Sequence, residues 1–218
     1  MITSEEIRKT VSIRLDGTVL KGNLVVPAKA TGMVLFSHGS GSSRLSPRNN
    51  YVAEVLQQKG LATLLFDLLT EDEDRIYENR FNIDLLTIRL IDVTQWAQQQ
   101  KEIKKLPMGY FGASTGAASA LRAAAFFGLD IKAVVSRGGR PDMALQDLNK
   151  VTAPTLLIVG GRDGLVIELN RKAYEKLQGN KKLEIVPQAT HLFEEPGKLA
   201  EVARISAEWF ANHLFNKK

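Results

Sequence analysis

Short apolar runs alternate with amphipathic stretches along most of this 218-residue chain. Continuous apolar runs of this kind suit strands that are buried on both faces of a sheet. The runs cover residues 33–36, 61–69, 108–111, 131–136, 155–159 and 183–186. Because strands and helices alternate, the sheet is expected to be mostly parallel, with helices on both of its faces.

Two of the intervening stretches carry residues at helical spacing, so that one face of each would pack on the sheet. The first contains Leu86, Leu90, Val93 and Ala97, and the second contains Leu199, Val202, Ser206, Trp209 and His213. A third helix of small residues is expected over residues 117–125.

The first part of the chain has a different pattern, since apolar and polar residues alternate over residues 11–15 and apolar residues recur over 19–26. Asp16-Gly17 stands between these segments, and such a pair is a strong hairpin signal. We therefore expect an antiparallel hairpin at one edge of the sheet and a single domain over residues 1–218. The polar connection 70–81 is long enough to be a flap, but no insertion is long enough for a separate cap domain.

Composition excludes several other classes of protein. Hydrophobic residues make up 44% and charged residues 24% of the chain, as in ordinary globular domains. No apolar run approaches the ~18 residues of a membrane-spanning helix, and the start of the chain does not look like a signal peptide, so we expect a cytoplasmic protein with no membrane partner. The net charge of +5 is scattered, which argues against nucleic-acid binding. The absence of cysteine excludes disulfides and a thiolate metal site. Oligomeric state is left open.

The sharpest chemical signal is Gly-Ala-Ser-Thr-Gly at residues 112–116. It follows an expected strand and precedes the helix of small residues, which is the context of a nucleophile elbow. The turn is so tight that the residues two before and two after Ser114 must lack bulk. We therefore expect Ser114 to be a nucleophile, the alternative being a structural glycine turn.

A serine hydroxyl is a weak nucleophile and needs a base. His191 follows the last expected strand, at the sheet edge where Ser114 should also lie, so it is the predicted base. His38 stands in a tight turn and is expected to hydrogen-bond locally. His213 is expected to have a surface or packing role.

The base needs a carboxylate that orients it. Asp163 follows the strand at 155–159 and should reach the same edge, which gives the chain order Ser114, Asp163, His191. Asp67, at the end of another strand, is the alternative, although it could equally cap a helix or anchor a loop.

An oxyanion formed at the carbonyl carbon needs donors aimed at it. One expected donor is the backbone N–H of Thr115, at a helix N-terminus. The other is the N–H of Ser40, in the glycine-containing loop 37–43. This loop could instead cradle a phosphate, but it lacks the Gly-Lys-Ser/Thr of a P-loop and a third glycine in dinucleotide-binding register.

With these motifs, the chain resembles the dienelactone hydrolase branch of the α/β-hydrolases over nearly its whole length. The likeness rests on residues 38–41, 112–116, 160–163 and 189–191. A closer similarity, to small hydrolases that also occur fused to phosphoribosyltransferase domains, rests on residues 40–48 and 135–142. The resemblance implies an α/β-hydrolase fold, a catalytic triad and no cofactor. True dienelactone hydrolases use a cysteine nucleophile, so Ser114 is a departure, and the lactone substrate does not carry over.

Five arginines should lie on loops around the mouth of this site, where guanidinium groups would favour a carboxylate or phosphate on the substrate. They are Arg44, Arg48, Arg137, Arg140 and Arg162, of which Arg44, Arg137 and Arg140 are the expected substrate-binding residues. Alternatively, Arg137 and Arg140 could tie loops to Asp142 or to the acidic stretch 71–74.

We therefore expect a serine hydrolase that acts on a small-molecule carboxylic ester, with or without an anionic group, through an acyl-enzyme. The alternatives are a thioesterase or lactone hydrolase with the same triad, or a non-catalytic binding module that reuses the fold.

Overall fold

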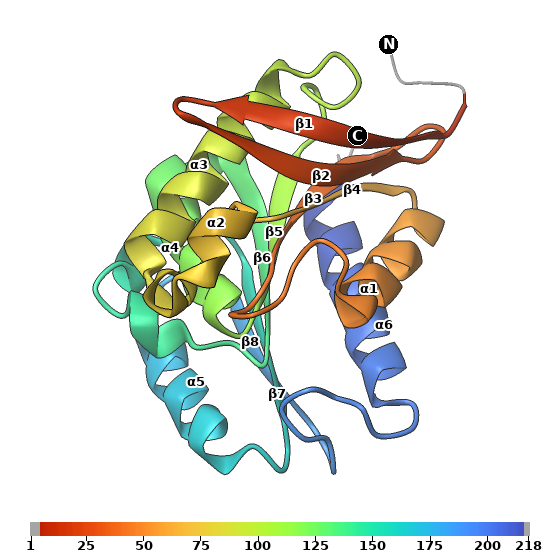
Figure 1. Cartoon of the computed structure of the whole chain (residues 1–218). Helices are drawn as coiled ribbons and strands as arrows, with labels where there is room; N and C mark the ends of the chain where they lie inside the picture. The colour runs from red at the N-terminus through yellow and green to blue at the C-terminus, as the bar shows by residue number, and fades with distance from the viewer. Residues whose placement is uncertain (1–4, 216–218) are drawn as a thin grey trace.

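A computed structural model describes residues 5–215 and shows one eight-stranded sheet with helices on both faces (Figure 1). The strand order is β1-β2-β4-β3-β5-β6-β7-β8. The strands are β1 (Ile7–Leu15), β2 (Thr18–Val26), β3 (Gly32–Ser37), β4 (Leu61–Phe66), β5 (Met108–Ala113), β6 (Ile131–Arg137), β7 (Thr155–Gly160) and β8 (Lys181–Val186).

The N-terminal hairpin forms as the Asp-Gly pair predicts. Strands β1 and β2 pair antiparallel, with Leu15 opposite Thr18. Gly17 closes the turn at a φ of 72°, a conformation that glycine adopts without steric cost. Strand β2 joins the main sheet by pairing antiparallel with β4, so the hairpin occupies one edge.

The other strand pairs, from β4 and β3 across to β8, are all parallel. Strands β3, β4, β5 and β7 are buried along their whole length, which explains their unbroken apolar runs. Strand β4 ends at Phe66, so the expected strand over 61–69 is too long at its carboxyl end. Asp67 follows the strand, and its carboxylate binds Arg44 in the loop between β3 and helix α1.

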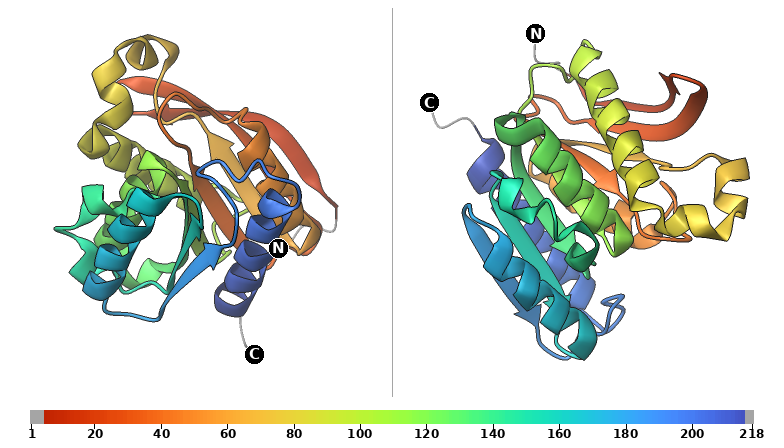
Figure 2. Two further views of the ribbon diagram at one scale, coloured as in Figure 1. Left: turned by 90° about the horizontal axis from the view of Figure 1, so that it is seen from below. Right: turned by 90° about the vertical axis from the view of Figure 1, so that its left-hand side faces the viewer.

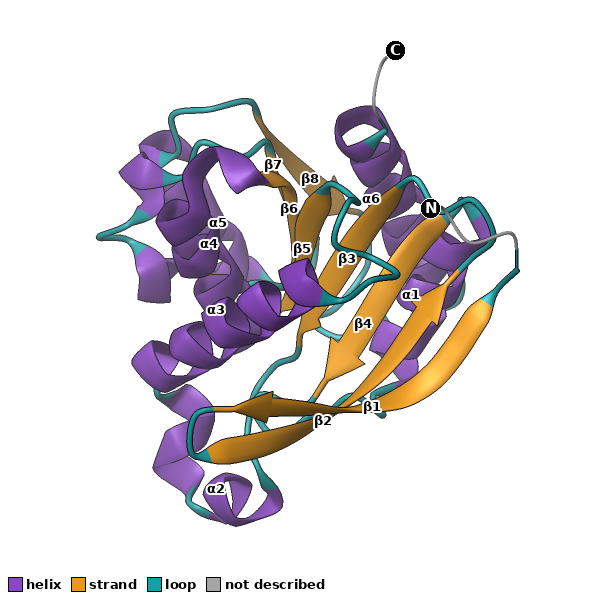
Figure 3. Ribbon diagram, turned by 90° about the horizontal axis from the view of Figure 1, so that it is seen from above, coloured by secondary structure: helices purple, strands orange, loops and turns teal. Residues whose placement is uncertain are grey.

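Five longer helices form the two outer layers (Figures 2 and 3). Helices α3 (Ile83–Gln99), α4 (Thr115–Phe127) and α5 (Gly164–Lys176) cover one face, while α1 (Pro47–Gln58) and α6 (Lys198–Leu214) cover the other. The core is correspondingly split by the sheet, with Leu90, Tyr110 and Leu121 on the first side and Phe36, Leu56 and Phe210 on the second. No helix within residues 5–215 is long and apolar enough to cross a membrane.

The polar connection 70–81 is folded rather than an irregular flap. It forms the short helix α2 (Glu71–Arg75) and a 3-10 turn at Tyr77–Phe81. Thr70 and Glu73 make a reciprocal capping box at its start. Arg80 forms two hydrogen bonds with the carboxylate of Asp74, and Arg89 of helix α3 binds Glu73.

Strands β3, β5, β6, β7 and β8 all deliver their carboxyl ends to one edge of the sheet, because they are parallel. Helix α4 packs so closely there that a Cβ on Gly116 would stand 2.2 Å from the carbonyl oxygen of Ser37, at the end of β3. Glycine at position 116 therefore permits the backbone contact that sets the spacing of the edge.

Replacing Gly116 with alanine should consequently destabilise the fold by about 1–3 kcal/mol or more, since two stretches of backbone would have to separate. Urea-induced unfolding measures this change. Gly164→Ala is the control, because nothing lies within 4 Å of the added methyl group and alanine is the better helix former by roughly 1 kcal/mol. Equal stability of the Gly116→Ala variant and the wild type would contradict the proposed packing constraint.

Candidate active site

Ser114 occupies the turn between strand β5 and helix α4. Its backbone lies at φ 50° and ψ −122°, a region that non-glycine residues rarely adopt. The strain is held by neighbouring backbone: Ser114 N–H donates to the Arg137 carbonyl at 3.2 Å, and Arg140 N–H donates to the Ser114 carbonyl at 3.0 Å. A Cβ on Gly112 would stand 2.5 Å from Ala117 Cα, so the turn tolerates no side chain there. This is the geometry of a nucleophile elbow.

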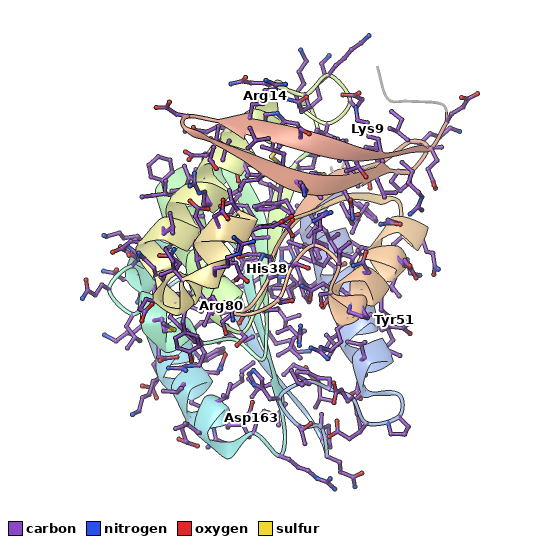
Figure 4. All side chains as sticks on the ribbon, in the orientation of Figure 1. Lys9, Arg14, His38, Tyr51, Arg80 and Asp163 are labelled. Atoms are coloured by element: carbon purple, nitrogen blue, oxygen red, sulfur yellow. The ribbon has the colours of Figure 1, made fainter. Side chains whose placement is uncertain are left out.

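Asp163 and His191 come together at the same edge of the sheet. Asp163 follows β7 and His191 follows β8, and His191 Nδ1 lies 2.6 Å from Asp163 Oδ2. The side chain of Asp163 is 17% exposed and that of His191 is 37% exposed. Asp163 is thus largely shielded, while the ring can be reached by a ligand; Figure 4 marks Asp163 at the end of the sheet.

The loop that carries His191 is fixed against the loop after β7. Arg162 N–H donates to the Ala189 carbonyl at 2.9 Å, and Thr190 N–H donates to Glu195 Oε1 at 3.0 Å. Gly160 makes this approach possible, because a Cβ there would stand 2.5 Å from two carbonyl oxygens of the loop. The Gly-Gly-Arg-Asp sequence therefore serves to bring the two loops into contact.

The imidazole ring lies at the end of the strand next to Ser114. A Cβ on Gly138 would stand 3.4 Å from His191 Cε1, and Gly138 directly follows Arg137, which is paired with Ala113. Ser114 Oγ forms no hydrogen bond with any residue from 5 to 215. The structure thus joins His191 to Asp163 by a hydrogen bond. Ser114 follows β5, the strand next to β6, and its hydroxyl has no hydrogen-bond partner in residues 5–215.

The expected oxyanion donors are adjacent, but one is occupied. Ser40 N–H donates to the hydroxyl of Thr115 at 2.9 Å. Gly39 brings this loop against the elbow, since a Cβ on it would stand 3.0 Å from Ser114 Cβ. The N–H of Thr115 lies in the first turn of α4, where backbone N–H groups have no partner within the helix.

Neither of the other two histidines is placed as a base for Ser114. The buried His38 accepts a hydrogen bond from Leu68 N–H through Nε2 at 3.0 Å, and its Nδ1 donates to the Gly39 carbonyl. Burial lowers the pKa of His38, so the ring stays neutral. Its two hydrogen bonds tie the loop 37–43 to the end of β4. His213 forms hydrogen bonds with the Trp209 carbonyl and with Asn180. Asn180 directly precedes β8, so His213 lies at the opposite end of the strands from Ser114.

Most of the expected substrate-binding arginines are already paired. Arg44 binds the carboxylate of Asp67 through both its backbone N–H and its guanidinium. Asp67, the alternative to Asp163 as the residue that orients the base, is therefore occupied by Arg44. Arg140 forms a two-point pair with Asp142 at 2.8 Å. The expectation that Arg44 and Arg140 bind substrate therefore meets a physical objection, since protein carboxylates already use their charge.

Arg137 differs from these residues. It is only 6% exposed and forms no ion pair with any carboxylate in residues 5–215. Its one side-chain hydrogen bond is from Nη2 to Asn49 Oδ1 of helix α1, at 3.2 Å. Asn49 was not among the residues expected at the site, because nothing in the sequence predicts that helix α1 reaches the end of β6.

A hollow of about 440 Å³ opens beside the loop 37–43, between the β1–β2 hairpin and helix α2. His38, Arg44 and Asp67 line it, together with the acidic residues Glu71, Asp72 and Asp74. Within residues 5–215, no group of three or more His, Asp or Glu side chains could hold a metal ion.

Comparisons with known proteins agree with this fold. Residues 30–204 match the model of a family described as an alpha/beta hydrolase domain. A solved structure of dienelactone hydrolase from Anabaena variabilis is 55% identical, with a TM-score of 0.93 over 96% of this chain and 99% of that one. Est1E from Butyrivibrio proteoclasticus shares the fold at 19% identity, with a TM-score of 0.81 over 93% and 98% of the two chains.

The chain belongs to the alpha/beta hydrolases, and the family match and the fold both support a hydrolase function. Within that family it falls in the branch that resembles dienelactone hydrolase. It is also 59% identical over 193 residues to Mycobacterium tuberculosis proteins named as phosphoribosyl transferases. That match covers 88% of this chain but 44% of those proteins, so the chain spans less than half the length of these curated relatives.

The buried His38 should make stability depend on pH. In the folded state its pKa lies below the ordinary 6.5, whereas the unfolded chain takes up the proton near that value, so falling pH favours unfolding by up to about 1.4 kcal/mol per pH unit. His38→Gln removes this term. The difference in unfolding free energy between wild type and variant should therefore be largest at pH 8 and shrink towards pH 5.

Urea unfolding from pH 8 to pH 5 measures this dependence. His213→Gln removes an imidazole elsewhere and is the matched control. A wild-type-to-variant difference for His38→Gln that stays constant over the range would show that the ring is not held neutral.

Proposed function

We propose that this protein is a serine hydrolase that cleaves a small carboxylic ester through an acyl-enzyme intermediate. Ser114 is the nucleophile, His191 the base, and Asp163 the residue that orients His191. The observation that carries the proposal is the 2.6 Å pair between His191 and Asp163, at the same edge of the sheet as the strained turn of Ser114. A serine presented on a strained turn and an imidazole oriented by a carboxylate are the groups that nucleophilic catalysis needs.

The proposed reaction has two halves. As Ser114 Oγ bonds to the carbonyl carbon, its proton moves to Nε2 of His191, and negative charge develops on the carbonyl oxygen. The tetrahedral intermediate then expels the alcohol, which takes the proton from His191. In the second half His191 removes a proton from water, the resulting hydroxide attacks the acyl carbon, and the acid leaves as Ser114 recovers its proton.

Asp163 contributes by accepting the hydrogen bond from Nδ1–H, which leaves Nε2 free to accept a proton from Ser114. A cyclic ester is the second candidate substrate, because the 55% identical relative from Anabaena variabilis is called a dienelactone hydrolase. Ring opening of a lactone uses the same steps, except that the leaving alcohol stays attached to the acyl group.

A fluorophosphonate probe should label the wild type, and Ser114→Ala should abolish labelling. The same substitution should lower kcat on p-nitrophenyl esters by at least about 10⁴-fold, because the covalent route is lost. Mass spectrometry of the labelled protein and steady-state kinetics measure both. Ser42→Ala, in the neighbouring loop, is the control. Equally slow hydrolysis by the wild type and by Ser114→Ala would contradict the proposal.

The oxyanion is assigned to the N–H groups of Thr115 and Ser40. In the structure the Thr115 hydroxyl accepts the Ser40 N–H, so this hydrogen bond has to break before the Ser40 N–H can donate to the substrate. Breaking a hydrogen bond of this kind costs about 0.5–1.5 kcal/mol net. The Thr115 hydroxyl thus limits how readily the second donor becomes available.

Thr115→Val should therefore raise kcat/KM on p-nitrophenyl esters, by about 2- to 10-fold, since valine keeps the shape but cannot accept the hydrogen bond. Thr115→Ser, which keeps the hydroxyl, is the control and should show no such increase. A loss of activity in Thr115→Val with full activity in Thr115→Ser would instead make the hydroxyl itself a donor to the oxyanion.

A further inference from the structure

Arg137 is a buried cation that forms no ion pair with any carboxylate in residues 5–215. It ends strand β6, and its side chain points to the sheet face that helices α1 and α6 cover, where it bonds to Asn49. The guanidinium Nε is buried and has no hydrogen-bond partner. Of the five N–H donors of a guanidinium, those on Nη2 reach the one protein acceptor described here, Asn49 Oδ1.

The surroundings of Arg137 add further positive charge instead of neutralising it. Burial, and to a lesser degree the charge of Arg48 in the first turn of helix α1, lower the pKa of Arg137 to about 10. The N-terminus of α1, which begins at Pro47, contributes its partial positive charge at the same place. Arg48 is itself paired with the carboxylate of Glu194 at 2.8 Å, so Arg137 is the arginine here without a carboxylate partner in residues 5–215.

Such an arrangement is costly unless an anion completes it. A desolvated charge is destabilising by several kcal/mol when nothing pairs with it. The paired Arg44 and Arg140 show that this chain elsewhere supplies a carboxylate for an arginine at this edge. At Arg137 a buried guanidinium, an amide side chain and a helix N-terminus converge, and no carboxylate in residues 5–215 pairs with that guanidinium.

The position of Arg137 connects its unpaired positive charge to the proposed reaction. The carbonyl of Arg137 accepts the N–H of Ser114, and a Cβ on the next residue, Gly138, would stand 3.4 Å from the ring of His191. Arg48 reaches the loop just beyond His191 through its bond to Glu194. Helix α1 itself, which carries Asn49, continues from the loop that carries Ser40.

We infer that Arg137 and Asn49 form a subsite for an anionic group of the substrate, a carboxylate or a phosphate, next to the ester that Ser114 attacks. This inference rests on the proposed function and narrows it to anionic esters. Arg137 would donate to the anion from the part of its guanidinium that Asn49 leaves free. Both oxyanions accept the planar donor pattern of arginine.

The test compares two pairs of esters that differ in charge. In the first pair the charge is on the acyl part: 4-nitrophenyl butyrate against mono-4-nitrophenyl glutarate. In the second it is on the leaving group: phenyl acetate against 3-acetoxybenzoate. The wild type should prefer the anionic member of at least one pair, and Arg137→Met should reduce the anionic-to-neutral ratio of kcat/KM for that pair by about 10- to 100-fold, the size expected for a lost charge-assisted contact.

Arg137→Lys should retain part of the preference, because it keeps the charge and loses only the planar donor pattern. Arg140→Met is the matched control, since it removes an arginine at the same edge that already has a carboxylate partner, and its ratio should equal that of the wild type. Methionine fills a buried arginine site with similar volume, so the fold should survive. A ratio in Arg137→Met equal to that of the wild type would overturn the inference.

A second readout does not depend on catalysis. Glutarate and inorganic phosphate should each be added to Ser114→Ala protein, and the rise in Tm should be lost on combining Ser114→Ala with Arg137→Met. A larger shift with glutarate indicates a carboxylate, and a larger shift with phosphate a phosphate. If no ester is hydrolysed in a Ser114-dependent way, the proposed function fails while this measurement still decides the anion subsite. No shift with either anion, together with no charge preference, would refute the subsite.

Discussion

The contact between helix α4 and the end of strand β3 is the constraint on which the rest of the edge depends. Two backbones meet where Gly116 faces the carbonyl of Ser37, and the hydroxyls of Ser37 and Ser119 bond across the same junction at 2.8 Å. This contact fixes the start of α4, and hence Thr115, against the loop that holds Ser40. It also fixes the turn that forces Ser114 into its strained backbone. Local strain is therefore held by close packing, which is how sites that need a protruding side chain are commonly built.

Much of this arrangement could be predicted from residue pattern. The hairpin, the buried parallel strands and the long helices α3 and α6 follow from periodicity, because two-sided and one-sided burial leave different signatures in sequence. The elbow at Ser114 and the pair of Asp163 with His191 could be anticipated because strand ends converge on one edge and few histidines compete. The segment 70–81 was harder, since its polar residues resemble a loop until Thr70 and Glu73 are seen to cap a helix.

Charge pairing was the part that sequence could not supply. Arg44, Arg137 and Arg140 look alike in the chain, yet they differ in three dimensions because Asp67 and Asp142 lie within reach of only two of them. The hydrogen-bond partner of Arg137 is the side-chain amide of Asn49 on helix α1, 88 positions away in the chain. No local sequence motif predicts that contact. Likewise, the bond from Ser40 N–H to the Thr115 hydroxyl depends on rotamer and loop conformation. Patterns predict which backbone segments meet, while the pairing of their polar atoms depends on the packed structure.

The hairpin has a consequence for how copies of the molecule meet. Strand β1 is the outer edge of the sheet, and its free backbone groups could extend into the sheet of a neighbour. Exposed cations stand along this strand, including Arg8, Lys9 and Arg14, and Figure 4 marks the last two. Two such edges laid against each other would bring like charges face to face, which opposes joining. These cations thus oppose edge-to-edge pairing of two copies along β1, the longer of the two edge strands of the sheet.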